Sequence, residues 1–277
     1  MKVLLFIVNY RADEPLRHCL LSVQQTAGCS ALELQVHVVD NSEYADDRLL
    51  QLQQMLSSFK NVPVHLHLPA RNNGYFGSLP LAQDLARQQG ADVVIFSNPD
   101  VRFADDFFDR LRRLRSPSSG MLAPAITARD GGFDQNPKYL QRLTRSRLSR
   151  LQRIYANPLA FKLYMGLARV KELLLGKAAR TVYLPGQAIY APHGATLVFT
   201  DPSFFANLPP YPCFLFGEEL FVAEEALQRK VTISYRPELQ IEDLRSQSVS
   251  QIPGPFHRQL MLSSVEYILS RYYSTAQ

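Results

Sequence analysis

Apolar runs alternate with helical patterns through the first hundred residues, and this alternation most constrains the fold. Runs rich in Val, Ile, Leu and Phe predict four strands, at residues 3–8, 34–39, 62–68 and 92–97. Helical spacing of apolar residues fills the gaps between them, at residues 15–26, 46–59 and 77–89. Continuously apolar strands are typical of sheets covered on both faces, and strand–helix alternation favours parallel pairing. We therefore expect an α/β fold with a Rossmann-type, mostly parallel sheet and helices on both faces.

Polar residues gather where these strands end, which is the edge at which open α/β sheets bind ligands. They are Asn9 and Tyr10 after the first strand, Asp40, Asn41 and Ser42 after the second, Asn72 and Gly74 after the third, and Asn98 and Asp100 after the fourth. Taken singly, such residues are common in helix caps and turns. Together at one edge they supply a carboxylate for a base or ribose, a loop for phosphates and a carboxylate for a metal.

Several motif-defined classes are disfavoured. No Gly-x-Gly-x-x-Gly follows the first strand and no Walker A sequence occurs, which argues against dinucleotide enzymes and P-loop NTPases. No His-Glu-x-x-His, Cys-x-x-Cys or Gly-x-Ser-x-Gly is present. His65 and His67 share one face of a predicted strand, but without a third ligand at metal spacing we interpret them as ordinary strand residues.

The second half adds two more motifs. His193-Gly194-Ala195 stands in a predicted loop that enters a strand, and Glu218-Glu219 opens a helix that continues to about residue 229. Acids in a first helical turn are favoured by the helix dipole, which is the structural explanation of this pair. The functional explanation is a carboxylate base at the rim of a pocket.

A basic insert lies between the halves. Residues 138–180 hold eleven Lys or Arg and a single acid, so this segment carries +10 and the rest of the chain −5, although the net charge is only +5. Its apolar residues predict two basic amphipathic helices broken near Asn157-Pro158, within an insert of about 135–182. Such helices fit an anionic membrane surface, and a solvated basic face is the alternative. Nucleic acid is disfavoured because no zinc-finger or RNP-type motif accompanies the charge.

The cysteine content and the N-terminal segment bear on the cellular compartment of the protein. The three cysteines are an odd number without close pairing, which is typical of free thiols in a reducing compartment. The apolar start resembles a signal peptide but ends at Asn9, with no small-residue cleavage site after it. We expect a cytoplasmic protein, peripheral on the inner face of the cytoplasmic membrane. A further amphipathic helix, at about 256–273, is expected near the C-terminus.

In the order and context of these motifs, the sequence resembles the family 2 glycosyltransferases, inverting enzymes of the GT-A fold. It is most similar to the bacterial branch that includes rhamnosyltransferases of surface polysaccharide assembly. The resemblance spans residues 3 to about 245 and implies a single glycosyltransferase domain over 1–277 that carries the insert. The implied donor is a nucleotide-diphosphate sugar, of rhamnose or another hexose. The implied acceptor is a saccharide, which the basic insert suggests is lipid-linked.

The resemblance also implies roles for single residues. Asn9, Tyr10 and Asp40 would line the nucleotide site with Asn41 and Ser42, Asp40 reading the pyrimidine base, and Asn72 and Gly74 match the loop after the third strand. Asp100 matches the last acid of the family's Asp-x-Asp and would bind Mg²⁺ or Mn²⁺ on the diphosphate. His193 and Gly194 would shape the pocket for donor sugar and acceptor. Glu219 would be the base, with Glu218 as the fallback.

Three departures from the family pattern accompany these matches. Asn98 replaces the first Asp of Asp-x-Asp, and Glu219 stands where Asp is usual. Asp243 occupies the position of a frequent His, so Arg245 is suggested for the phosphate role. Two alternatives stay open, and the departures at Asn98 and Asp243 motivate the second of them. One is a nucleotidyltransferase, although the sequence after the first strand is a poor phosphate loop. The other is a glycosyltransferase-like binding protein of weak catalytic power.

Overall fold

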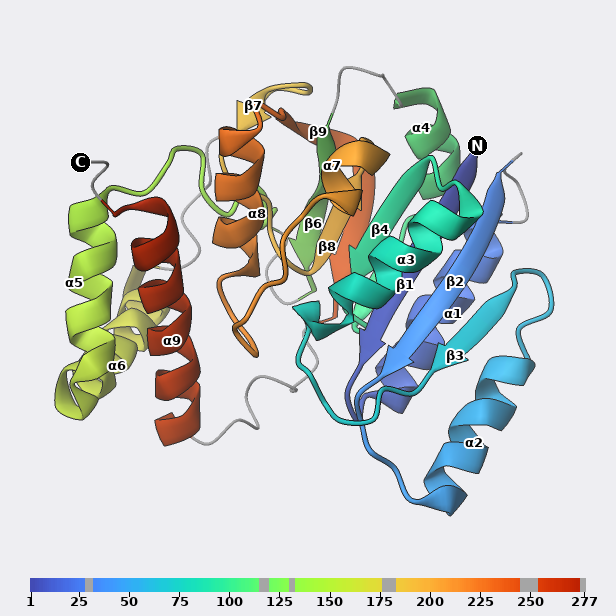
Figure 1. Cartoon of the computed structure of the whole chain (residues 1–277), viewed down its shortest axis with the longest axis horizontal. Coiled ribbons are helices and arrows are strands. Elements are labelled where there is room, and N and C mark those ends of the chain that lie inside the picture. The colour runs from blue at the N-terminus through green and yellow to red at the C-terminus, as the bar shows by residue number, and fades with distance from the viewer. Residues whose placement is uncertain (28–31, 115–119, 130–132, 176–182, 245–253, 275–277) are drawn as a thin grey trace.

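A computed structural model describes residues 1–27, 32–114, 120–129, 133–175, 183–244 and 254–274, with the backbone alone at 168, 169 and 171–175. The first half alternates strands and helices much as its sequence predicts (Figure 1). The elements are β1 (Lys2–Asn9), α1 (Asp13–Ala27), β2 (Glu33–Asp40), α2 (Asp46–Ser57), β3 (Val64–His67), the 3-10 helix η1 (Phe76–Ser78), α3 (Leu79–Gln89) and β4 (Val93–Ser97).

The second half returns to the same sheet. Its elements are β5 (Val101–Phe103), α4 (Phe107–Leu114), β6 (Met121–Ala128), α5 (Arg145–Ala156), α6 (Pro158–Leu175), β7 (Ala188–Ile189), β8 (Thr196–Phe199), α7 (Pro202–Ala206), α8 (Glu218–Gln228), β9 (Ile233–Asp243) and α9 (Gly254–Tyr272). The insert helices break at Asn157, as predicted, but the first begins at Arg145, because residues near Tyr139 pair as a bridge with Ala191 instead.

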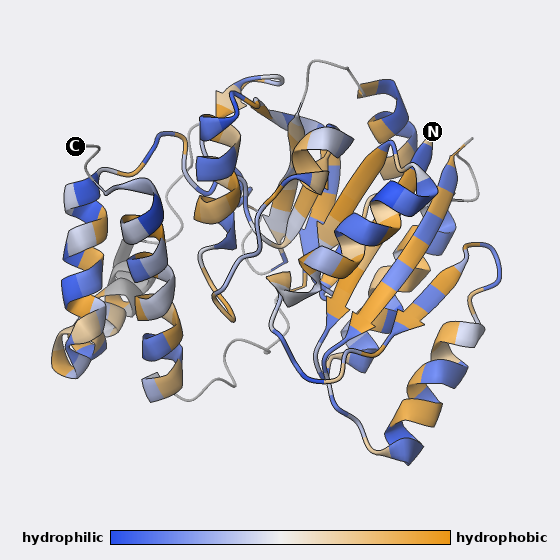
Figure 2. Ribbon diagram, in the orientation of Figure 1, coloured by the Kyte–Doolittle hydropathy of each residue, from blue (hydrophilic) through white to orange (hydrophobic). Residues whose placement is uncertain are grey.

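The strand order of the sheet is β3-β2-β1-β4-β8-β6-β9-β5, with β7 on β9. Strands β3, β2, β1 and β4 run parallel, and β8 enters antiparallel beside β4. The apolar strands show clearly in Figure 2. The predicted α/β class is confirmed. Because β1, β2 and β4 are parallel neighbours, their carboxyl ends and polar residues share one edge.

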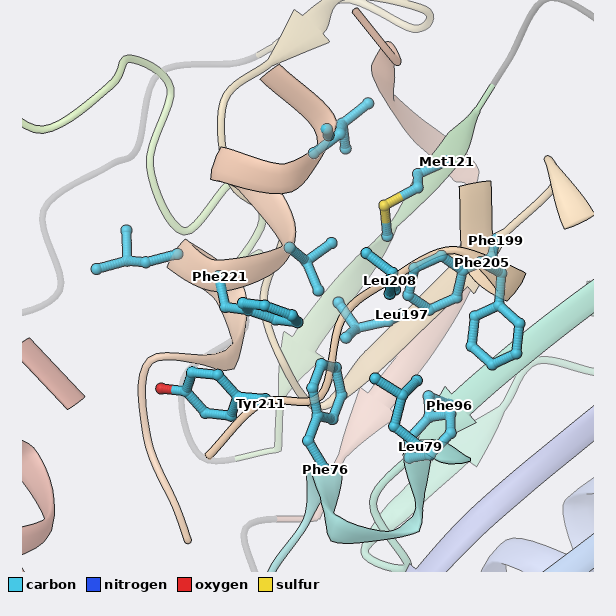
Figure 3. Close-up of a cluster of buried hydrophobic side chains, with 14 of the residues drawn as sticks. Phe76, Leu79, Phe96, Met121, Leu197, Phe199, Phe205, Leu208, Tyr211 and Phe221 are labelled. Carbon is cyan, nitrogen blue, oxygen red and sulfur yellow. The ribbon is translucent and has the colours of Figure 1, made fainter. Parts of the chain in front are cut away.

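Two apolar layers cover the sheet. Helices α1, α2 and α4 cover one face, and α3, α7, α8 and α9 contribute to the other. In the second layer an aromatic cluster joins Phe76 and Phe96 to Phe221 and Tyr211, with ring centroids 4.8–6.2 Å apart (Figure 3). Edge-on and tilted rings of this kind pack favourably. The cluster fixes η1 and α8 against each other, beside the edge where the strands end.

A histidine cluster continues the aromatic row across β2 and β3. The ring of His37 stacks on Phe6 at 4.9 Å and on His65 at 5.0 Å, and its Nδ1 lies 3.0 Å from Nε2 of His67. Burial, with smaller contributions from the neighbouring histidines, lowers the pKa of His37 to about 3. The neutral imidazole is therefore the form that the folded protein accommodates.

This histidine makes folding sensitive to acid. In the unfolded chain His37 binds a proton near pH 6.5, whereas in the folded chain it resists until about pH 3. Stability is therefore full above pH 6.5 and is lost as the pH falls toward 3. Between pH 7 and 4 we expect the wild type to lose about 3 kcal/mol more than His37→Phe, which keeps the stack without the titration. Urea unfolding at both pH values measures this difference, and equal losses would contradict the assignment.

Candidate active site

A cleft of about 1200 Å³ opens at the edge where β1, β2 and β4 end. Helix α8 and the loop before it form the opposite wall. Most of the sequence-predicted residues line this cleft: Tyr10, Asn41, Asn72, Gly74, Asn98, Asp100, His193, Gly194, Glu218 and Glu219. Asn9, Asp40 and Ser42 do not line it, and Arg245 lies outside the described residues.

Asp40 lies under the cleft floor with Asn9 and Ser42. Its side chain is buried, and its Oδ1 accepts hydrogen bonds from Asn9 Nδ2 at 2.8 Å and Ser42 Oγ at 2.6 Å. Burial raises the pKa of Asp40, and the two hydrogen bonds oppose that shift. Ser42 Oγ in turn accepts from the backbone N–H of Arg11 at 2.7 Å, which ties the β1 loop to the β2 loop. In this structure Asp40 therefore supports the floor, and a direct contact with a base stays a prediction.

Asp13, at the start of α1, also lines the cleft, and it was not among the residues predicted from the sequence. Its Oδ1 accepts from Tyr44 OH at 2.9 Å, and its Oδ2 lies 3.5 Å from Nη2 of Arg48. Asp13 and Arg48 both line the cleft, together with Arg11 and Arg17. Asp13 looks like an ordinary first-turn acid of α1 in the sequence, so only the contact with α2 distinguishes it.

The loop after β3 reaches across the cleft. Gly74 N–H donates to Asn72 Oδ1 at 2.9 Å, and Asn41 Nδ2 donates to Gly74 O at 3.0 Å. Gly74 has φ +76, and a Cβ at this residue would lie 1.9 Å from the backbone oxygen of Phe214. Glycine alone fits this turn, because any side chain would meet the opposite wall. The predicted phosphate loop therefore also fixes the width of the cleft.

Oxygen ligands are available where β4 ends. Asn98 and Asp100 both line the cleft, and Asn98 N–H donates to Ala195 O at 2.8 Å. Among the described residues no group of three or more His, Cys, Asp or Glu side chains could hold a metal on its own. One carboxylate and one amide oxygen fit Mg²⁺ or Mn²⁺ when substrate phosphates and water complete the shell, as is usual for Mg²⁺.

Asp243, which replaces a frequent histidine of the resembled family, ends β9 opposite Val101. Its Oδ2 accepts from Gln135 Nε2 at 2.6 Å, and the side chain is buried. The next residue, Leu244, donates its N–H to Asp100 O at 2.9 Å. The strand therefore braces the Asp100 turn through its backbone.

The two acids that open α8 have different environments. Glu218 is buried, and desolvation, assisted by the charge of Glu219, raises the pKa of Glu218 to about 8. The side chain of Glu219 is 18% exposed and reaches the cleft, where its Oε1 lies 3.7 Å from Nζ of Lys138. At neutral pH Glu218 is therefore largely protonated, which leaves Glu219 as the carboxylate available to accept a proton.

Aromatic side chains form the wall next to these acids. Phe214, Phe216 and Phe256 line the cleft, and Phe216 stacks on His257 of α9 with ring centroids 4.8 Å apart. Phe216 has φ +70, and its carbonyl accepts from Tyr211 OH at 2.5 Å. A bulky residue in this region is strained, and such strain concentrates at functional sites. The packing of α9 against α8 thus completes the cleft with residues that no sequence motif marks.

Comparison with solved structures places the fold. No family model matches the sequence, and no curated protein matches it. GalNAc-T7 with UDP, GalNAc and Mn²⁺ aligns over 98% of this chain and 48% of its own, with a TM-score of 0.64 at 12% identity. Staphylococcus aureus TarS with UDP-GlcNAc aligns over 99% and 68%, with a TM-score of 0.59 at 12% identity.

A third structure is the Pyrobaculum calidifontis mannosyltransferase PcManGT with GDP-Man and Mn²⁺. It aligns over 99% of this chain and 76% of its own, with a TM-score of 0.55 at 11% identity. The chain spans about half the length of the GalNAc-T7 chain. At such identities the likeness concerns the fold, which is GT-A-like.

Proposed function

We propose that this protein is an inverting glycosyltransferase. It moves a sugar, rhamnose or another hexose, from a nucleotide diphosphate to a saccharide acceptor in bacterial surface polysaccharide assembly. One observation carries the proposal: one cleft in a GT-A-like fold is lined by Asn98 and Asp100 from the end of β4 and by Glu219 from α8. The structures that share this fold contain UDP, GDP-Man or UDP-GlcNAc. Residues 1–277 act as one catalytic domain with the insert as an appendage.

The donor occupies the side of the cleft below β1 and β2. Tyr10, Asn41 and the turn at Gly74 contact the nucleotide, and Arg11 and Arg48 supply positive charge. Asp100, with Asn98 beside it, would hold a divalent ion at the diphosphate. When bound, that ion supplies the positive charge that a leaving diphosphate needs.

The acceptor occupies the side lined by Phe216 and Phe256, next to Glu219. Glu219 takes the proton of the acceptor hydroxyl as the hydroxyl oxygen attacks the anomeric carbon and the bond to the diphosphate breaks. One displacement from the face opposite the leaving group inverts the configuration. Only one base is needed, because the leaving diphosphate requires no protonation by a second carboxyl group, in contrast to glycoside hydrolysis.

A donor screen tests the proposal. The full chain is incubated with UDP-, GDP- and dTDP-sugars, with and without Mn²⁺, alone and with a lipid-linked saccharide fraction from bacterial membranes. We expect one donor to release its nucleoside diphosphate, faster with acceptor and with Mn²⁺. Release of pyrophosphate from a nucleoside triphosphate and a sugar phosphate would indicate a nucleotidyltransferase instead. Binding of a donor without turnover would indicate a binding protein.

We further propose that the insert docks on an anionic membrane, which brings the enzyme to a lipid-linked acceptor. Helix α6 exposes an apolar stripe at helical spacing: Leu159 is 73% exposed, Leu163 68%, Leu167 69% and Val170 48%. Exposed Lys162 lies beside it, and α5 presents exposed arginines at 145, 147, 150 and 153. A group of exposed leucines marks an interaction surface. The cations beside it attract anionic lipid, whereas they would repel the basic insert of a second copy of the chain.

A paired substitution tests the docking. Leu163→Glu/Leu167→Glu is expected to weaken binding to phosphatidylcholine–phosphatidylglycerol vesicles at least tenfold, because two exposed leucines that would enter the lipid are replaced by charges that the anionic lipid repels. Leu50→Glu on α2, which is 54% exposed in the wild type, is the matched control and should bind normally. Vesicle sedimentation measures both variants. Undiminished vesicle binding by the double variant would show that the insert does not dock on the membrane through these leucines.

Among the helices that the structure describes, none is both long and apolar enough to cross a bilayer.

A further inference from the structure

Lys138 places an ammonium group beside the proposed base. Its Nζ lies 3.7 Å from Oε1 of Glu219, and both side chains line the cleft. The lysine is 39% exposed and the glutamate 18%, so water screens the pair only in part. An ammonium at this distance favours the charged form of a carboxylate. In the sequence Lys138 is only the first of the eleven basic residues of the insert.

The backbone around Lys138 is anchored on both sides. Asn136 is buried, donates its Nδ2 to Pro124 O at 2.7 Å, and accepts the backbone N–H of His193 on its Oδ1 at 2.7 Å. Tyr139 and Ala191 exchange two backbone hydrogen bonds, of 3.2 and 2.9 Å. Hydrogen bonds thus join the segment that carries Lys138 to the segment that carries His193. They fix the backbone from which the ammonium group reaches the cleft.

The side chain of Glu219 also packs against Gly194. A Cβ on Gly194 would lie 3.2 Å from both Cγ and Oε1 of Glu219, so the carboxylate packs against bare backbone. Tyr75 OH donates to the carbonyl of Gly194 at 3.1 Å and fixes that backbone. Oε1 of Glu219 is therefore close both to the backbone of Gly194 and to the ammonium of Lys138.

Three other titratable groups lie near Glu219, and the charge of Lys138 also acts on two of them, Glu218 and Tyr139. They are Glu218 on its own helix, Tyr75 from the loop before η1, and Tyr139 next to Lys138. Burial raises the pKa of all three, so each is largely uncharged at neutral pH. Glu219 is therefore the carboxylate of this group that remains to pair with Lys138, while Asp100 in the same cleft and Arg147 in the insert add further charge.

We propose that Lys138 is a positioning residue that keeps Glu219 ionised and turned toward the acceptor hydroxyl. The inference rests on the proposed function, because it takes Glu219 as the base. Lys138 acts through Glu219 and touches neither reacting atom. A lysine that instead contacted the donor diphosphate would affect the KM for the donor rather than the protonation of the base.

The kinetic test uses the full chain with the donor and acceptor found in the screen. Lys138→Gln should lower kcat about tenfold, move the acid limb of the kcat profile up by about 0.7 pH unit, and leave the donor KM within twofold. Lys138→Arg should restore the position of the limb, because it restores the charge. Lys60→Gln, which removes an exposed cation outside the cleft, is the matched control. An unmoved limb, or a raised donor KM at unchanged kcat, overturns the proposal.

A second readout does not need turnover. In protein labelled with ¹³C at the glutamate carboxyl groups, the Glu219 resonance is identified by its loss in Glu219→Gln. Its titration midpoint should move to higher pH in Lys138→Gln and return in Lys138→Arg. A midpoint that stays in place overturns the positioning role even if the enzyme is active. A shifted midpoint in a protein that turns over no donor would leave the electrostatic pair intact and refute the proposed reaction.

Discussion

Glu219→Gln is expected to lower kcat by about 10²- to 10⁴-fold, the usual contribution of a general base. The amide is nearly isosteric with the carboxylate, so the cleft keeps its shape, but the amide cannot take the proton of the acceptor hydroxyl. Donor binding should be nearly unchanged, because Glu219 comes from α8, whereas the proposed diphosphate and metal contacts come from the end of β4. Steady-state release of nucleoside diphosphate measures kcat, and calorimetry measures donor Kd.

Glu218→Gln is the matched control for this experiment. Since burial raises the pKa of Glu218 to about 8, its amide resembles the protonated form that dominates at pH 7. We expect a loss below tenfold at pH 7, far less than for Glu219→Gln. If Glu218→Gln lowered kcat more than Glu219→Gln, Glu218 would be the base and the assignment of Glu219 would be wrong.

Gly74→Ala is expected to destabilise the fold by about 3 kcal/mol and to abolish nucleotide binding. The added Cβ would lie 1.9 Å from Phe214 O, at a residue whose φ is +76. Left-handed strain accounts for about 1 kcal/mol of the loss, and displacement of the opposing backbone for the rest. Because that displacement spreads the two walls, both the donor loop and the aromatic wall move.

Gly90→Ala separates the cost of left-handed backbone strain from the cost of the steric clash. Gly90 has φ +62 at the C-terminus of α3, and no atom lies within 4 Å of the Cβ position. This variant carries the left-handed strain without the clash, so it should cost about 1 kcal/mol and bind nucleotide normally. Urea unfolding of both variants gives the difference. Equal costs, or normal nucleotide binding by Gly74→Ala, would show that the cleft is not set by this contact.

Local sequence patterns predicted the central elements well. The strands β1, β2 and β4 are continuous apolar runs, and the helices between them have clear spacing, so tertiary packing had little to override. Parallel order alone brings Tyr10, Asn41 and Asp100 to one edge. Their meeting in one cleft could therefore be expected before any side chain was placed.

Features that depend on contacts between distant segments were not predictable in the same way. Asp40 is buried beneath Asn9 and Ser42, which both donate hydrogen bonds to it. Asp13 pairs with Arg48 only because α2 packs next to the start of α1. Lys138 reaches Glu219 only because the chain around Asn136 is bonded to the chain around His193. The sequence likewise suggested amphipathic insert helices, but not that α5 would bury Leu148 while α6 exposes Leu163.

Nucleoside diphosphate binding in the presence of Mn²⁺ tests the central claim most directly, namely that the cleft at the carboxyl ends of β1, β2 and β4 is a sugar-nucleotide site. Calorimetry with UDP, GDP and dTDP is expected to find one ligand that binds the wild type, and at least tenfold weaker binding in Asp100→Asn. Glu219→Gln should bind that ligand like the wild type. If none of the three binds, or if Asp100→Asn binds as tightly as the wild type, the assignment of this cleft to a nucleotide sugar is wrong.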